Sequence, residues 1–330
     1  MSTTQTVTPA RPAAEPPEKP TSAPPKPPTA VANKVFAGVS LGAGIAILIT
    51  LLLVALFLLL QAWPALSQGT EAISGMTGGR SFLAYVTPLL FGTVLASIIA
   101  LLLAVPLAIG ISLFISHYAP RRVASVLGYL VDLLAAIPSV VYGLWGFVTF
   151  RPVIEPAFNW LHETLGFLPL FTEYQAPARN ILFGGMVLAI MVLPIITATI
   201  RETFLQTPRL HEEAAWALGA TRWEMVRMAV LPFGRSGIIA GSMLGLGRAL
   251  GETMAILMVL SPGLQINFHL LQPGQHQTIA GNIALNFPEA FGISASVLIA
   301  TGLALFVLTF LVNYVARFII NRRAEFSGAN

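Results

Sequence analysis

The chain has 330 residues, of which 55% are hydrophobic and only 10% are charged, and its formal net charge is +4 at pH 7. Soluble domains carry about 25% charged residues, so this composition excludes an ordinary soluble protein and predicts a polytopic membrane protein. The sequence contains no cysteine, which excludes disulfide bonds and thiolate metal ligands.

Residues 1–34 hold nine of the 24 prolines, together with threonine, alanine and a few charges. Such a segment has too little apolar surface to bury, and its prolines favour extended polyproline conformations. It is also too long and too rich in proline to be the basic start of a secretory signal. We expect it to form a disordered cytoplasmic tail.

Six later segments are long and apolar enough to cross about 30 Å of hydrocarbon as helices. The sequence therefore predicts an all-α fold with a first transmembrane helix, an external loop at 63–85, a core at 86–316 with five more helices, and a cytoplasmic C-terminus at 317–330. The predicted spans are 35–62, 86–116, 124–149, 180–203, 236–260 and 291–316.

Basic residues indicate how the spans are oriented, because they accumulate on the cytoplasmic side of a membrane. If the N-terminus is inside, the inner segments carry 14 lysines and arginines and the outer segments carry three. This bias predicts a multi-pass protein of the bacterial inner (plasma) membrane with both termini in the cytoplasm. The three outer residues are Arg80, Arg151 and Arg179.

The inner loop at 207–233 has the pattern of two short helices joined by a glycine turn. Pro208 suits the first turn of a helix, and Gly219 suits the left-handed residue after its end. Thr221 and Glu224 match the capping box that starts a second helix. We expect Pro232 to stop or kink that second helix.

The fifth span carries two charges, Arg248 and Glu252, close to the expected bilayer midplane. If the span is one helix, the two lie one turn apart on the same face and form a pair. Glycines at a spacing of four residues predict that this span packs closely against its neighbours. These are Gly237, Gly241 and Gly245 in one row, and Gly247 and Gly251 in another.

Two interpretations of the charged pair are open. In the first, it is a buried salt bridge that fixes the register of the helix. In the second, the guanidinium of Arg248 offers several N–H donors to an oxyanion, and Glu252 holds that guanidinium when the path is empty. Asp132 in the third span has a water-accessible or helix-packing role rather than a role in a proton relay, and we expect Pro138 to kink its helix.

No other pattern indicates chemistry. The five histidines are scattered, and none pairs at helical spacing with a second histidine and a carboxylate, so we expect neither a metal site nor hydrolytic chemistry. All three lysines lie in the first 34 residues, so the apolar part cannot contain a phosphate-binding loop with its GK[ST] signature. If nucleotide drives this protein, another chain binds it.

The inner loop resembles the EAA loop of bacterial ABC-importer permeases. The match consists of Glu213, Ala214, Ala215 and Gly219, followed by Leu231 and Pro232 at the family's spacing. The resemblance implies a type I ABC-importer permease fold in which the first helix of the loop, with Glu212, docks into a cleft of a cytoplasmic ATPase. Ala229 departs from the family pattern, which usually has isoleucine there. The alternative is an amphipathic helix lying on the membrane surface.

A second resemblance concerns the substrate. The segments MLGLGRALGETMAIL at 243–257 and AAIPSVVYGLWGF at 135–147 are similar to those of permeases from phosphate importers. Met254 and Ala255 favour one of the two permease types in such importers. The resemblance implicates Arg248 and Glu252 in phosphate translocation. It also implies a second permease subunit, two ATPase subunits that bind ATP and Mg²⁺, and an external phosphate-binding protein.

Three alternatives remain open. The first is a permease for another oxyanion, such as sulfate or molybdate. The second is a secondary transporter driven by an ion gradient, a class that commonly shows inverted repeats and broken helices; no clear repeat is found here. The third is a membrane sensor without transport. The expected partners are the lipid bilayer and the subunits named above; we expect no nucleic acid as a partner and no cofactor in this chain.

Overall fold

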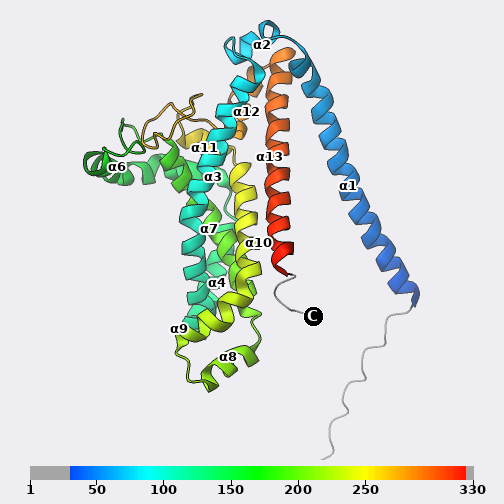
Figure 1. Ribbon diagram of the computed structural model, residues 1–330, viewed down its shortest axis with the longest axis vertical. Coiled ribbons are helices and arrows are strands. Elements are labelled where there is room, and N and C mark those ends of the chain that lie inside the picture. Colours follow the sequence, from blue (N-terminus) through cyan, green and yellow to red (C-terminus); the bar gives the residue numbers. More distant parts are fainter. Residues whose placement is uncertain (1–29, 325–330) are drawn as a thin grey trace, which may run out of the picture. The chain divides into compact units, whose positions relative to one another are not determined.

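The computed structural model describes residues 30–324 of the chain, with side chains from residue 33 to residue 318 (Figure 1). Every regular element in this part is a helix, which confirms the predicted all-α class. The predicted tail lies outside the described residues except for its last five, which are helical. The chain divides into two units after Leu53, and the description below of how elements pack concerns the second unit.

The first helix, α1, runs from Ala30 to Ser67 and is apolar on all sides. Its exposed leucines, such as Leu48 and Leu52, are each 68% accessible. A helix that is apolar all round and long enough to cross the hydrocarbon is a membrane span. A short helix, α2 (Thr70–Thr77), follows it and ends at Gly78, whose φ is +62°.

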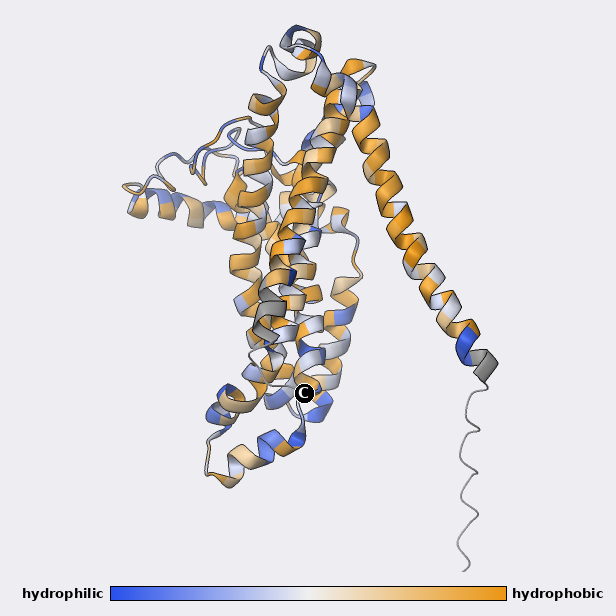
Figure 2. Ribbon diagram, turned by 45° about the vertical axis from the view of Figure 1, so that its right-hand side comes forward, coloured by the Kyte–Doolittle hydropathy of each residue, from blue (hydrophilic) through white to orange (hydrophobic). Residues whose placement is uncertain are grey.

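The second span is α3 (Phe82–Leu113), which begins where the hydroxyl of Ser81 accepts a hydrogen bond from Ala84 N. It continues as a π-helical turn, η1 (Phe114–Tyr118). The whole stretch lies in the apolar band that Figure 2 shows across the helical bundle.

The third span differs from the prediction of one kinked helix over 124–149. It consists of α4 (Arg121–Ala135), a break at residues 136–138, and then α5 (Ser139–Trp145), which runs on through η2 (Gly146–Phe150) into α6 (Arg151–Leu165). The two parts meet at 92°. Pro138 causes more than a kink, because neither its ring nor its missing N–H fits the interior of a helix. The outer connection expected at 150–179 is therefore helical as far as Leu165.

The fourth span is α7 (Ile181–Leu205), and the inner loop follows it. The loop contains α8 (Arg209–Ala217), the glycine turn and α9 (Arg222–Met225). Gly219 has a φ of +80°, and both hydrogen bonds of the Thr221–Glu224 capping box are present, as predicted. We call the end of the bundle that carries this loop the α8 end, and the other the α2 end.

The second helix of the loop does not stop at Pro232, which was one of the two predicted outcomes. It passes through a π turn, η3 (Val226–Val230), into α10 (Leu231–Leu250). In the π turn Leu231 N bonds to Val226 O, five residues back. This wider turn moves the carbonyl that a proline ring would otherwise strike. All three π turns in the described part of the chain are followed two residues later by a proline, namely Pro120, Pro152 and Pro232.

The chain then crosses to the α2 end through α11 (Met254–Val259) and a long loop, followed by α12 (Ile279–Asn286) and a 3-10 turn, η4 (Phe287–Glu289). The last span, α13 (Ile293–Ala324), returns toward the α8 end (Figure 1). The described part thus contains five continuous spans, or six if the bent pair α4 and α5–α6 counts as one.

The core of the second unit lies among α3, α7 and α10. The first predicted glycine row packs as expected, because a Cβ at Gly237 would strike the side chain of Thr203 and one at Gly245 would lie 2.5 Å from Ile196 Cδ1. The second row does not pack. Among the described residues, a Cβ at Gly247 would meet no atom within 4 Å, and one at Gly251 would meet only its own helix.

Candidate functional site

Two broken spans meet beside each other in the bundle. Gly143 in α5 faces α11 so closely that a Cβ there would lie 2.8 Å from Ala255 Cα. The break at 136–138 precedes α5, and a second break, at 251–253, precedes α11. Non-helical backbone at membrane depth is tolerated only where protein or a water-filled path surrounds it. The backbone at both breaks is therefore surrounded by protein or water rather than by lipid.

Glu252 lies in the second break, so the prediction of one continuous helix over 236–260 is wrong. Gly251 ends α10, and Glu252 is 8% exposed. Its Oε1 accepts a hydrogen bond from Ala255 N at 3.0 Å, in the first turn of α11. The predicted ion pair between Glu252 and Arg248, both of which the structure describes, is absent, because the break turns the carboxylate toward the start of the next helix.

Arg248, near the end of α10, instead reaches the end of α4. Its Nη1 donates to Ala135 O at 3.5 Å, and the neighbouring carbonyl, that of Leu134, accepts from the Tyr142 hydroxyl at 2.8 Å. Within the described residues this is the guanidinium's one hydrogen bond. Its other N–H donors remain available to a ligand.

Each of the two charges is therefore placed at a helix end of suitable polarity. Carboxylates are stabilised at the N-terminus of a helix and cations at the C-terminus, because the unpaired N–H and C=O groups carry partial charges of opposite sign there. Glu252 lies at the N-terminus of α11, and Arg248 lies at the C-terminus of α4. The sequence tolerates two charges at this depth because the spans are broken beside them.

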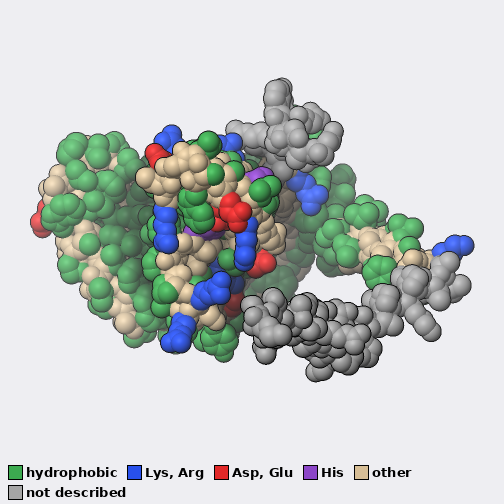
Figure 3. Space-filling model, turned by 90° about the horizontal axis from the view of Figure 1, so that it is seen from below, with side chains coloured by type: hydrophobic (Ala, Val, Ile, Leu, Met, Phe, Trp, Pro, Cys, Tyr) green, Lys and Arg blue, Asp and Glu red, His purple; other side chains and the backbone are tan. Residues whose placement is uncertain are grey.

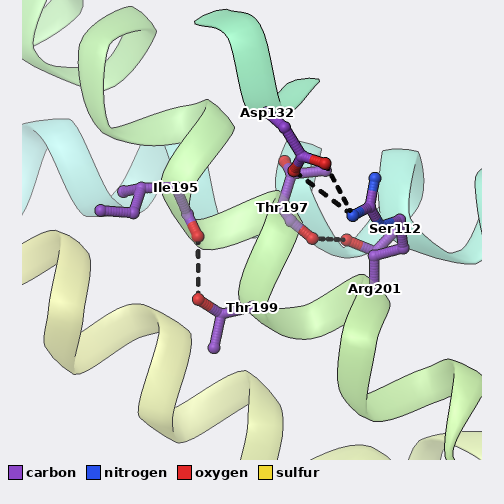
Figure 4. Close-up of polar contacts among 6 residues, drawn as sticks. All are labelled: Ser112, Asp132, Ile195, Thr197, Thr199 and Arg201. Carbon is purple, nitrogen blue, oxygen red and sulfur yellow. Dashed lines mark hydrogen bonds and ion pairs between the residues drawn. The ribbon is translucent and has the colours of Figure 1, made fainter. Parts of the chain in front are cut away.

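The structure also brings together a pair that sequence reasoning missed. Arg201 of α7 donates from Nη2 to both carboxylate oxygens of Asp132 on α4, at 3.3 and 3.2 Å (Figure 4). The same view shows the Ser112 hydroxyl, which donates to Thr197 O and joins α3 to α7. In the sequence, Arg201 is one of the basic residues of the inner segments, and no local signal links it to a carboxylate 69 residues away.

The helix predicted to dock on an ATPase, α8, has two different faces. Glu213 and Ala214 are exposed, whereas Ala215 is buried and Glu212 turns toward the bundle, where its Oε1 lies 3.4 Å from His117 Nε2. Large apolar side chains also stand free on and directly after this helix, namely Leu210 (73%), Trp216 (49%) and Leu218 (82%).

Basic side chains surround this helix. Figure 3, seen from the α8 end, shows basic side chains on this face, with a few carboxylates between them. The exposed arginines of the segments at this end are Arg121, Arg122, Arg209, Arg222, Arg227 and Arg235.

Beyond the breaks, two arginines flank an aromatic ring. The guanidinium carbons of Arg151 and Arg179 lie 4.4 and 5.7 Å from the centre of the Phe147 ring. Arg179 also lines a small cavity of about 80 Å³ beside α11, together with Gln277. A larger cavity, of about 360 Å³ between the end of α1, α3 and α13, is lined by apolar side chains and offers nothing to an anion.

Comparison with known families decides to which group of proteins this arrangement belongs. Residues 104–324 match the family described as "Binding-protein-dependent transport system inner membrane component". The match covers two thirds of the chain, including both breaks and the α8 loop. The chain belongs to this family. It is therefore a multi-pass membrane permease of a binding-protein-dependent transport system.

Individual relatives of this permease are similar over most of their length. The phosphate transport system permease protein PstC 2 of Mycobacterium tuberculosis is 45% identical over 294 residues, which cover 86% of this chain and 90% of the relative. PstC of Mycobacterium leprae is 46% identical, with 82% and 88% covered. PstC of Mesorhizobium japonicum is 37% identical, with 91% and 93% covered. The predicted resemblance to this type of permease is confirmed.

Proposed function

We propose that this permease is the transmembrane subunit of an ATP-driven phosphate importer and forms half of its translocation path. The names of its relatives support this substrate, and one observation in the chain itself carries the proposal. Arg248 lies where two broken spans meet, with most of its N–H donors free of hydrogen bonds to the described residues. A planar guanidinium with free donors matches the oxygens of phosphate.

The open face of α10 is the side on which the path lies. Leu244, Gly247 and Gly251 are exposed along this face, and Arg248 is beside them. Glycines leave this surface without side chains, so an anion or a partner helix can come close to the backbone. A second, similar permease supplies the other half of the path, since one chain exposes this face without covering it.

The driving energy comes from another polypeptide. Two ATPase subunits bind ATP and Mg²⁺ and receive α8 in a cleft, where Leu210, Trp216 and Leu218 provide the apolar contacts and Glu213 a charge. Such exposed apolar side chains are typical of the anchors of protein interfaces. Closure of the ATPases moves α8, and the spans rock between inward and outward access. The translocation step involves no covalent chemistry.

The same proposal sets the orientation in the bacterial inner (plasma) membrane. The α8 end and both termini face the cytoplasm, in keeping with the arginines gathered around α8. An external phosphate-binding protein delivers the anion to the α2 end. Arg179, with the small cavity beside α11, lies on that side of the breaks.

Phosphate uptake by the complete importer tests the proposal. Arg248→Gln removes the donors and the charge, and we expect uptake per assembled complex to fall by about a hundredfold, the effect of losing a charged hydrogen-bonding group from a site. Arg248→Lys keeps the charge without the planar fork and should be intermediate. Arg235→Gln, which changes an exposed arginine on the same helix, is the control.

Full uptake by Arg248→Gln would refute the proposed role of Arg248 in binding the anion. Competition by sulfate or molybdate stronger than by phosphate would assign the other oxyanions.

A secondary transporter is the second candidate, because the two broken spans are a feature of that class. Membership of a binding-protein-dependent family speaks against it. The two are separated by purification of the chain with its partners. If an ATPase co-purifies with the chain, and no longer does so when Leu218 and Trp216 are both changed to serine, the result supports the importer. If vesicles that contain this chain alone take up the anion without nucleotide, the result supports the secondary transporter.

A further inference from the structure

The guanidinium of Arg201 lies directly against α4. Gly128 on α4 is buried, and a Cβ there would lie 2.5 Å from Arg201 Nη1, so the guanidinium would have to shift to accommodate a larger residue. The Arg201 side chain is 14% exposed. Its Nε is buried without a hydrogen-bond partner among the described residues. Asp132 accepts hydrogen bonds only from Nη2, so the carboxylate does not pair with Nε of the guanidinium.

Asp132 is free to move away from this arginine. Its side chain is 55% exposed on a face of α4 whose other exposed residues include Tyr129 and Leu133. A carboxylate on an apolar face at membrane depth cannot face lipid without a cost of a few kcal/mol. The face around Asp132 therefore meets water or a partner rather than lipid.

The two arginines converge on the last turns of α4. Asp132, which binds Arg201, and Ala135, whose carbonyl binds Arg248, are three residues apart, or about 4.5 Å along the helix. Helical side chains point back toward the start of their own helix. Because α7 and α10 run in opposite directions, Arg201 and Arg248 extend toward each other, Arg201 from the α8 side and Arg248 from the side of the breaks.

We propose that Arg201 is a second anion-binding residue of the path, on the α8 side of Arg248, and that Asp132 occupies it when no anion is bound. This inference rests on the proposed function. A tetrahedral oxyanion leaving Arg248 displaces the carboxylate from Nη2 and accepts also from Nε, which Asp132 does not reach. Arg201 lies near the end of α7, eight residues before α8 begins, so a movement of α8 acts directly on this second position.

A double variant separates this role from that of a structural salt bridge. In the complete importer, Arg201→Gln should lower phosphate uptake per complex by about tenfold. Asp132→Asn should retain more uptake than Arg201→Gln, since the arginine remains. If the pair only joins α4 to α7, removal of both charges in Asp132→Asn/Arg201→Gln restores uptake, and the proposal is overturned. If the arginine binds the anion, the double variant stays as low as Arg201→Gln. Arg122→Gln, at the start of α4, is the matched control.

Chemical modification tests binding without relying on transport or on the stability of the arginine variants. Phenylglyoxal reacts with accessible arginines, and peptide mass spectrometry reads Arg201 and Arg248 separately. In Asp132→Asn, Arg201 should react about tenfold faster than in the unaltered chain, and inorganic phosphate should slow that reaction. Protection of Arg248 alone overturns the proposal but leaves the phosphate path intact. Protection of both by sulfate or molybdate but not by phosphate keeps the second position and refutes the substrate. If none of the three anions slows the reaction of either arginine with phenylglyoxal, the proposal of a second anion-binding position is overturned.

Discussion

His117 Nε2 lies 3.4 Å from Glu212 Oε1 and joins α8 to the last turn of the second span. The contact is shielded, since the two side chains are 9% and 18% exposed. Nδ1 of the same ring is hydrogen-bonded to the Ser116 hydroxyl at 2.7 Å, which fixes the orientation of the imidazole. The helix expected to receive movement from the ATPase is thus tied by a side chain to η1.

We predict that loss of this contact uncouples ATP hydrolysis from transport. Glu212→Ala or His117→Ala should leave α8 able to dock, because its exposed apolar side chains are unchanged, but should transmit its movement poorly to α3. We expect the number of ATP molecules hydrolysed per phosphate transported to rise about threefold, in keeping with about 1 kcal/mol or less for a contact between two ionisable side chains. The measurement needs proteoliposomes with the complete importer. His211→Ala, exposed on the same helix, is the control, and an unchanged ratio in both variants would contradict the prediction.

The approach of α5 to α11 gives a second prediction, based on two glycines that differ only in their surroundings. Gly143→Ala puts a Cβ 2.8 Å from Ala255 Cα and should destabilise the purified chain by about 1–3 kcal/mol, as overpacking does. Gly247→Ala meets nothing within 4 Å among the described residues and should stabilise its helix by roughly 0.5–1 kcal/mol. Thermal unfolding in detergent measures both. Equal midpoints for the two variants would show that the close contact is unimportant.

The sequence was sufficient for features with a local or periodic signal. Apolar length located the spans, because crossing hydrocarbon requires about 20 such residues whatever the packing. Gly219 and the Thr221–Glu224 box were correctly assigned for a similar reason, since a left-handed turn and a reciprocal cap each involve residues within a few positions of one another.

The helix breaks and the pairs of residues distant in sequence could not be predicted from local or periodic patterns. Nothing local to GLGRALGETM requires the helix to end at Gly251, since a glycine inside a membrane helix is often tolerated. The end is set by what lies around it, with Arg248 at the end of α4 and Glu252 at the start of α11. The partner of Asp132 was missed because the pair depends on α4 and α7 packing together, which hydropathy does not encode.

The loop at 261–278 offers a prediction about pH. Burial lowers the pKa of His276 below its ordinary value of 6.5. Nε2–H donates to Asn267 O at 2.8 Å, and the buried Nδ1 has no partner among the described residues, so the neutral ring fits this place and the imidazolium does not. The stabilising effect of the neutral ring is complete above pH 6.5. It declines as the pH falls below that value, where the unfolded state takes up a proton before the folded state does.

We therefore expect the loop at 261–278 to become more sensitive to protease as the pH falls from about 7.5 to about 5.5, a range that spans the ordinary histidine pKa. His276→Gln should remove most of this pH dependence, because the amide does not titrate and can still donate to Asn267 O. His211→Gln, at the other end of the bundle, should behave like the unaltered chain. A pH profile that is the same with and without His276 would assign the effect to another group.

Glu252 gives the last prediction, because its contact separates a capping role from a role of its charge. Oε1 accepts from Ala255 N, and the side-chain carbonyl of glutamine can accept the same hydrogen bond. If Glu252 mainly restarts the helix after the break, Glu252→Gln keeps the stability of the chain, whereas Glu252→Ala loses about 1 kcal/mol or more, as removal of an N-terminal cap does.

Uptake measured on the same two variants then isolates the effect of the Glu252 charge. We expect Glu252→Gln to bind phosphate more tightly at Arg248 and release it more slowly, because a carboxylate near the path repels the anion and a neutral amide does not. If Glu252→Gln and the unaltered importer have equal uptake kinetics, the charge of Glu252 has no role in transport and the residue only caps α11.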